Sequence, residues 1–179
     1  MDKLQRLRQA VAITGAILTL IGNILESFSN LPRPEPTKIA NRKSLATSQE
    51  ALEVEQFFKP YEWKFVDWSL MTKYDGDQKA CLYFMSDEAF LYYYPAYMIM
   101  TLHDPANRCG LLHPVASIAC GHEEKQDLFQ LMQSGYNMSQ KRCVGRFLLN
   151  INEHFVMRYG DMNLGISPKE AAERYWLAN

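Results

Sequence analysis

The sequence predicts a mostly α protein that folds as a single compact domain of about six helices. Apolar residues recur at spacings of three and four along most of the chain, as on one face of a helix. Serine or threonine residues precede several of these segments in patterns typical of helix starts. The 179 residues are enough for one domain, and a composition of 47% hydrophobic and 22% charged residues is typical of globular proteins.

The first predicted helix covers residues 10–25, which contain no charged residue and follow Lys3, Arg6 and Arg8. A signal peptide would show this order, but no small-x-small cleavage site follows. A membrane anchor needs about 17–25 apolar residues, and polar residues and glycines interrupt this run. A helix of the folded domain is favoured by one apolar stripe, formed by Ile13, Ile17, Leu20, Ile24 and Phe28. We therefore divide the chain into an N-terminal extension or first helix (1–22), with anchoring as the alternative, and one helical domain (23–179).

The second predicted helix begins at Thr47 and ends before Pro60. The segment from Thr47 to Glu50 has the pattern of a capping box, in which the hydroxyl and the carboxylate each bond a backbone amide of the first turn. Three prolines in residues 32–36 separate this helix from the first one, because proline removes a helical hydrogen bond.

The central predicted helix covers residues 86–102 and contains Pro95 in its middle. Ser86 is the expected N-cap, and Asp87 and Glu88 suit the positive end of the helix dipole. Proline disfavours helical geometry at the preceding residue, so we expect a proline-bent helix near Pro95 or two short helices that meet there. The aromatic residues of this segment are expected to pack in the core.

Three further helices are predicted in the C-terminal half, after a loop at 103–121. One spans 123–133 and stops at Gly135, and one spans 139–155 with Ser139 as its cap. The last begins at Ser167, with Pro168 at its first helical position, and presents an apolar face that includes Trp176.

The sequence identifies no activity. The net charge of −1 gives no basic field for general nucleic-acid binding, and the phosphate-binding glycine motifs and the nucleophile elbow are absent. The four cysteines are widely spaced and are expected to be reduced, mostly buried thiols. We assign no catalytic residue, no cofactor-binding residue and no metal ligand, and we expect no cofactor.

An alternative function is centred on the 103–122 segment, where histidine and cysteine residues gather. Four such side chains can enclose a zinc ion, although the spacings match no common zinc module. This alternative is a metal-binding protein or an enzyme, and it requires at least three residues of one set to converge: His103, Cys109, His113, Cys120 and His122.

Residues 81–102, with the sequence CLYFMSDEAFLYYYPAYMIMTL, resemble the central segment of a family of small bacterial proteins known as a domain of unknown function. The resemblance rests on an E-A-F…Y-x-P-A-Y core and on a closing A-x-x-x-Y-W helix, here Ala171 to Trp176. It extends over residues 21–177 and implies a soluble bacterial domain. It brings no known catalytic residues.

The function expected from these observations is that of a non-catalytic bacterial protein that acts by protein–protein interaction, with an immunity-like or inhibitor-like role toward a toxin. The expected partner is another protein and not a nucleic acid, and membrane contact is open only to residues 10–25. The expected location is cytoplasmic, with an inner-membrane anchor as the alternative. Tyrosine and tryptophan are preferred interface anchors, so the expected surface lies among Trp63, Trp68, Tyr92, Tyr93 and Tyr94.

Overall fold

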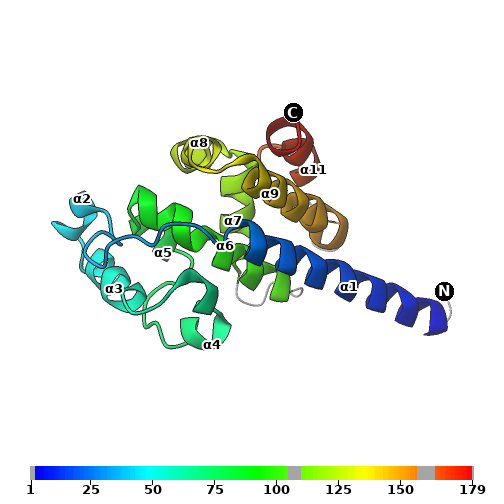
Figure 1. Ribbon diagram of the computed structural model, residues 1–179, viewed down its shortest axis with the longest axis horizontal. Coiled ribbons are helices and arrows are strands. Elements are labelled where there is room, and N and C mark those ends of the chain that lie inside the picture. Colours follow the sequence, from blue (N-terminus) through cyan, green and yellow to red (C-terminus); the bar gives the residue numbers. More distant parts are fainter. Residues whose placement is uncertain (1–2, 105–109, 157–163, 179) are drawn as a thin grey trace.

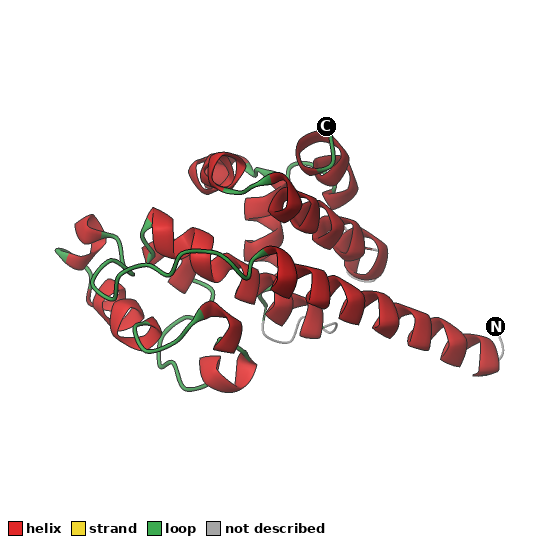
Figure 2. Ribbon diagram, viewed as in Figure 1, coloured by secondary structure: helices red, strands yellow, loops and turns green. Residues whose placement is uncertain are grey.

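The chain forms a mostly α domain, as predicted (Figures 1 and 2). The structure is a computed structural model that describes residues 3–104, 110–156 and 164–178. Within these ranges the only β-type pairing is an isolated antiparallel bridge between Ala40 and Met85. The fold therefore depends on helix packing and not on a sheet.

Helices of very different length make up this domain. The long ones are α1 (Lys3–Ser27), α3 (Gln49–Phe58), α6 (Asp87–His103), α7 (Leu112–Cys120), α8 (Gln126–Gly135) and α9 (Met138–Ile151). Four-residue helices are α2 (Arg42–Leu45), α4 (Trp68–Met71), α5 (Cys81–Phe84) and α11 (Pro168–Ala171). Single turns are η1 (Trp63–Phe65), η2 (Glu123–Lys125), η3 (Asn152–Val156) and η4 (Ala172–Trp176). The described ranges thus hold ten α-helices where about six were predicted, and the excess lies mainly in four-residue segments.

Helix α1 runs along one side of the domain, packs against α9 and α6, and extends beyond the body toward its N-terminus (Figure 1). Of its predicted core stripe, Leu20, Ile24 and Phe28 are buried, whereas Ile13 and Ile17 are half-buried. The helix thus enters the core with its C-terminal half. The boundary after residue 22, which the sequence suggested between an N-terminal extension and the domain, falls inside this continuous helix.

Helix α6 is the centre of the core, since twelve of its seventeen residues are buried. It runs through Pro95 without interruption, so the alternative of two short helices was wrong. Proline has no N–H to donate to the carbonyl four residues earlier, here that of Leu91. The Tyr136 hydroxyl donates to this Leu91 carbonyl at 3.0 Å. A side chain that is distant in sequence therefore replaces the bond that Pro95 removes.

We expect Tyr136→Phe to lower the free energy of unfolding by about 1–3 kcal/mol, because it leaves the half-buried Leu91 carbonyl without this donor. Urea denaturation of the wild type and the variant measures this loss. In a Pro95→Ala background the restored N–H can serve Leu91, so the same change at Tyr136 should cost less there. An equal cost in both backgrounds would contradict this role of the hydroxyl.

The predicted loop at 103–121 was wrong, because residues 112–120 form α7. Pro114 lies in the first turn of this helix, where the backbone amides have no helical partner to lose. Gly121 ends the helix with φ 70°, a left-handed conformation that glycine adopts without steric cost. The sequence signals for α7 were a proline in its first turn and a glycine after its last turn.

Helix starts were predicted with mixed success. The caps at Ser86 and Ser167 are confirmed, since their hydroxyls accept from Ala89 N and Glu170 N. The predicted cap at Thr47 is displaced by one residue, because Ser48 accepts from Ala51 N instead. The predicted cap at Ser139 is displaced by two residues, to Asn137, which forms a capping box with Gln140. Each error exchanged one short polar residue for a neighbour of the same capping ability.

Candidate binding groove

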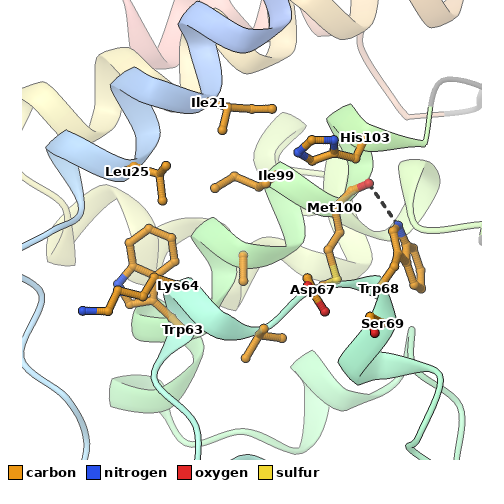
Figure 3. A pocket seen from close by; sticks show the side chains of 12 residues that line it. Ile21, Leu25, Trp63, Lys64, Asp67, Trp68, Ser69, Ile99, Met100 and His103 are labelled. Atoms are coloured by element: carbon orange, nitrogen blue, oxygen red, sulfur yellow. Dashed lines mark hydrogen bonds between the residues drawn. The ribbon is translucent and has the colours of Figure 1, made fainter.

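An apolar groove lies between α1, the η1–α4 segment and α6 (Figure 3). It encloses about 410 Å³, and Ile21 and Leu25 of α1 lie on the side opposite Trp63 and Lys64. We call it the tryptophan groove and define it by its lining residues: Ile21, Leu25, Trp63, Lys64, Val66, Asp67, Trp68, Ser69, Ala96, Ile99, Met100 and His103.

The two tryptophans are held in place by a hydrogen bond to α6, by a helix cap and by burial. The Trp68 indole N–H donates to the carbonyl of Met100 at 3.2 Å, which ties the short helix α4 to α6. Asp67 caps α4 by accepting from the Leu70 amide at 2.8 Å, and this fixes the turn between the tryptophans. Trp63 is buried with 4% exposure, so its ring forms part of the groove wall. The groove is therefore preformed.

The rim of the groove combines exposed apolar surface with paired charges. Leu25 is 42% exposed and Phe65, next to the groove, is 62% exposed. Lys64 Nζ lies 2.8 Å from Glu62 Oε2 and 5.2 Å from the centre of the Phe65 ring. The hydrogen bond from Lys64 lowers the pKa of the Glu62 carboxyl, so both groups are charged at neutral pH.

A second hollow of about 360 Å³ adjoins the groove and shares Leu25, Trp63 and Lys64 with it. It extends toward Arg33 and Tyr92. The Tyr92 hydroxyl is partly buried, which raises its pKa, so it stays neutral at physiological pH. The two hollows therefore meet at Leu25, Trp63 and Lys64.

The groove is lined mostly by apolar side chains, with a few polar ones among them. Its ionisable lining residues are Lys64, Asp67 and His103. Ser69 is the only hydroxyl among the lining residues, and the structure places no histidine or carboxylate hydrogen bond on it. Apolar surface with a few polar groups at the edge is typical of ligand and peptide sites.

The histidine and cysteine residues of the 103–122 segment lie in different surroundings. His103 and His113 are exposed, and the first is at the end of the groove. Cys120 is buried, and burial raises the pKa of its thiol to about 12. The His122 Nδ1 accepts from the Glu124 amide, and Cys109 lies outside the described residues. In the described part of the chain no three histidine, cysteine or acidic residues are grouped as metal ligands.

The aromatic residues expected at a surface are mostly in the core. Tyr93 is fully buried and donates to the carbonyls of Phe58 and Tyr61, and Tyr94 donates to the carbonyl of Val115. Only Trp63 and Trp68 line the groove, and Tyr92 borders the adjoining hollow. The cysteines among the described residues, Cys81, Cys120 and Cys143, are buried free thiols, as expected.

Sequence reasoning missed the aliphatic side of the groove. Ile21 and Leu25 lie in the predicted first helix and Ile99 in the predicted central helix, but none of them was expected at a binding surface. The spacing of Leu18 and Leu25, outside the predicted core stripe, was the signal that α1 has a second apolar face. No helix in the described ranges has the length and apolar character needed to cross a membrane.

These features define a small helical domain with a preformed apolar groove. The chain belongs to the family of unknown function DUF6714, whose model matches residues 19–179. The groove and the Pro95 helix lie within the matched part. Neither the curated proteins nor the solved structures contain a match to this chain.

Proposed function

We propose that this protein is a non-catalytic, cytoplasmic bacterial protein that binds another protein through the tryptophan groove, in the manner of an immunity or inhibitor protein that blocks a toxin. The observation that supports this most is the exposed apolar groove with two tryptophans, next to the exposed Leu25 and Phe65. Contiguous apolar surface exposed on a folded domain is typical of an interaction site.

The groove suits a partner that presents apolar side chains from a helix or an extended segment. Binding energy in interfaces is concentrated in a few well-packed residues, and tryptophan is enriched among them. Because Trp68 is already fixed by its hydrogen bond to Met100 and Trp63 by burial, binding needs little ordering of this side. The charges of Lys64 and Asp67 at the edge would orient the partner.

The experiment is a co-purification from the native bacterium with a C-terminal tag, read by mass spectrometry for the wild type and two variants. Ser69→Arg places a long charged side chain in the groove, at an exposed position on α4. Ser134→Arg makes the same change at an exposed position on α8, which lies elsewhere on the domain (Figure 1). We expect one partner in stoichiometric amount with the wild type and Ser134→Arg, and at least a tenfold lower yield with Ser69→Arg.

The inhibitory role is tested with the purified partner. We expect the partner alone to arrest growth when it is expressed, and co-expression of the wild type but not of Ser69→Arg to restore growth. A partner recovered equally with both variants would refute the groove as the binding site. A groove-dependent partner without toxicity would refute the immunity-like role and leave the binding function.

A further inference from the structure

A polar hollow of about 730 Å³ lies beside the contact between α1 and α9, two helices that Figure 1 shows side by side. The helices run antiparallel, because the Ser27 hydroxyl lies 2.9 Å from that of Ser139, whereas Asn23, one turn earlier, meets Cys143, one turn later. The hollow shares no lining residue with the tryptophan groove. We call it the arginine hollow and define it by its lining residues: Asn23, Glu26, Ser27, Ser29, Asn30, Ser139, Arg142, Cys143 and Arg146.

The lining comes mainly from one stripe of each helix. Positions 139, 142, 143 and 146 have the spacing of one face of α9, and positions 23, 26, 27 and 30 have the same spacing along α1 and just beyond its end. Hydrogen bonds join the two stripes. The Cys143 thiol donates to the Ser27 hydroxyl at 3.3 Å, and the Gln140 side chain donates to the Ser27 carbonyl at 3.3 Å. Direct bonds between the helices therefore hold the lining in place.

The two arginines of the arginine hollow are exposed and have no partner within the described residues. Neither Arg142 nor Arg146 forms an ion pair or a side-chain hydrogen bond there. Helix α9 contains no acidic residue, and like charges four positions apart lower the stability of a helix slightly. The pair is thus not explained by helix stability, and its guanidinium donors are available to a ligand.

The arrangement of these charges favours a phosphate group. Two neighbouring guanidinium groups suit a phosphate, whose several oxygens accept hydrogen bonds from more than one arginine, whereas a single bidentate arginine satisfies a carboxylate. The N-terminal end of α9, where Ser139 lies, adds the partial positive charge of the helix dipole. An anion with two negative charges therefore fits this side of the hollow.

The side of the hollow that α1 supplies favours hydroxyl groups. Glu26 forms no ion pair with Arg142 or Arg146 within the described residues, so the opposite charges of the hollow stand apart. Its carboxylate accepts hydrogen bonds, and the amides of Asn23 and Asn30 both donate and accept them. No aromatic side chain is among the lining residues, so the hollow offers no surface on which a nucleobase would stack.

We propose that the arginine hollow binds the phosphate monoester of a small compound rich in hydroxyl groups, such as a sugar or polyol phosphate. Arg142 and Arg146 hold the phosphate, and Glu26 with the two asparagines holds the hydroxyl groups. The volume of the hollow lies within the range of about 300–1,000 Å³ that is usual for small-molecule sites. This favours a small ligand over a phosphorylated segment of another protein. The site is separate from the protein-binding function proposed above.

The test is isothermal titration calorimetry of the full chain with glycerol 3-phosphate, ribose 5-phosphate and glucose 6-phosphate. Inorganic phosphate and glucose are the reference compounds, measured at the same ionic strength. We expect at least one ester to bind about tenfold more tightly than inorganic phosphate, because contacts with its hydroxyl groups add to those with the phosphate. Glucose should give no heat of binding, because it lacks the charged group.

Variants then assign the ester to the hollow. Arg142→Ala and Arg146→Ala should each raise the Kd of the ester by about tenfold or more, because each removes charge-assisted hydrogen bonds. Both positions are exposed on a helix, where alanine preserves the fold. Lys141→Ala is the matched control. It removes a positive charge from the same helix at a position outside the hollow, so the Kd should change by less than about threefold.

The role of Glu26 is tested by Glu26→Gln. This change removes the repulsion of phosphate from every ligand but weakens the acceptor of hydroxyl groups for the esters alone. The preference for the ester over inorganic phosphate should therefore decrease. An unchanged preference would refute the placement of the hydroxyl groups at α1.

Three results would overturn the inference as a whole. They are the absence of binding by every ester at millimolar concentration, an ester affinity equal to that of inorganic phosphate, and a Kd that neither arginine variant changes. Tighter binding of a phosphoserine peptide than of every ester would also overturn it, because the ligand would then be a protein segment. The proposed function is independent of all these results, since it is tested at Ser69 on α4.

Discussion

Replacing Trp176 by alanine is expected to lower the free energy of unfolding by about 3–5 kcal/mol, the range for removal of a large aromatic side chain from a core. Trp176 is 1% exposed in the closing turn η4, and its ring packs edge-to-face on Phe129 with centroids 5.7 Å apart. Its indole N–H donates to the carbonyl of Ala119 at 2.7 Å. One side chain thus joins η4 to α8 and α7, and urea denaturation measures its loss.

Two controls separate packing from the hydrogen bond at Trp176. Trp176→Phe keeps an aromatic ring but leaves the Ala119 carbonyl without its donor, so we expect an intermediate loss. Phe65→Ala removes an aromatic side chain that is 62% exposed, and its effect should stay within about 0.5 kcal/mol. A Trp176→Ala loss as small as that of Phe65→Ala would show that the C-terminal turn is not part of the cooperative fold.

The sequence predicted those features that depend on neighbouring residues. Ser86 and Ser167 were identified as caps because the capping bond reaches only three residues along the chain. The buried stripe of α1 was visible from helical spacing alone, at least at Leu20, Ile24 and Phe28. Local rules therefore gave the helical class and, of the ten described α-helices, the starts of α3, α6, α9 and α11 to within two residues.

Features that depend on distant residues could not be predicted. The continuity of α6 through Pro95 depends on Tyr136, which follows Leu91 by 45 positions and supplies the missing donor. The tryptophan groove likewise combines side chains from α1, η1, α4 and α6, and no local pattern indicates that Leu25 and Trp63 meet. Tertiary packing decides both, and packing outweighs the local preference of proline.

Alkaline pH is expected to destabilise the protein strongly, through two buried thiols. Burial raises the pKa of Cys81 and of Cys120 to about 12 from the ordinary value of 9.0. Between pH 9 and 12 the folded chain keeps these protons and the unfolded chain releases them. The unfolded state then binds fewer protons, so stability falls as pH rises, by about 1.4 kcal/mol per pH unit for each thiol. Below pH 9 this stability is fully present.

The two thiols together should cost about 5 kcal/mol by pH 11, which is comparable with the whole stability of many domains. Burial also raises the pKa values of Tyr94, Tyr97 and Tyr136 above their ordinary value of 10.0, and these groups add to the loss at higher pH. Urea denaturation of the wild type and of a variant without these thiols, at pH 8, 9.5 and 10, measures the share of the thiols, because the tyrosines titrate in both proteins. The Cys81→Ala, Cys120→Ala double variant should start from a lower stability at pH 8 but fall less steeply toward pH 10. Equal slopes for the variant and the wild type would show that other groups cause the alkaline loss, because only the titration of the thiols, and not their packing, changes over this pH range.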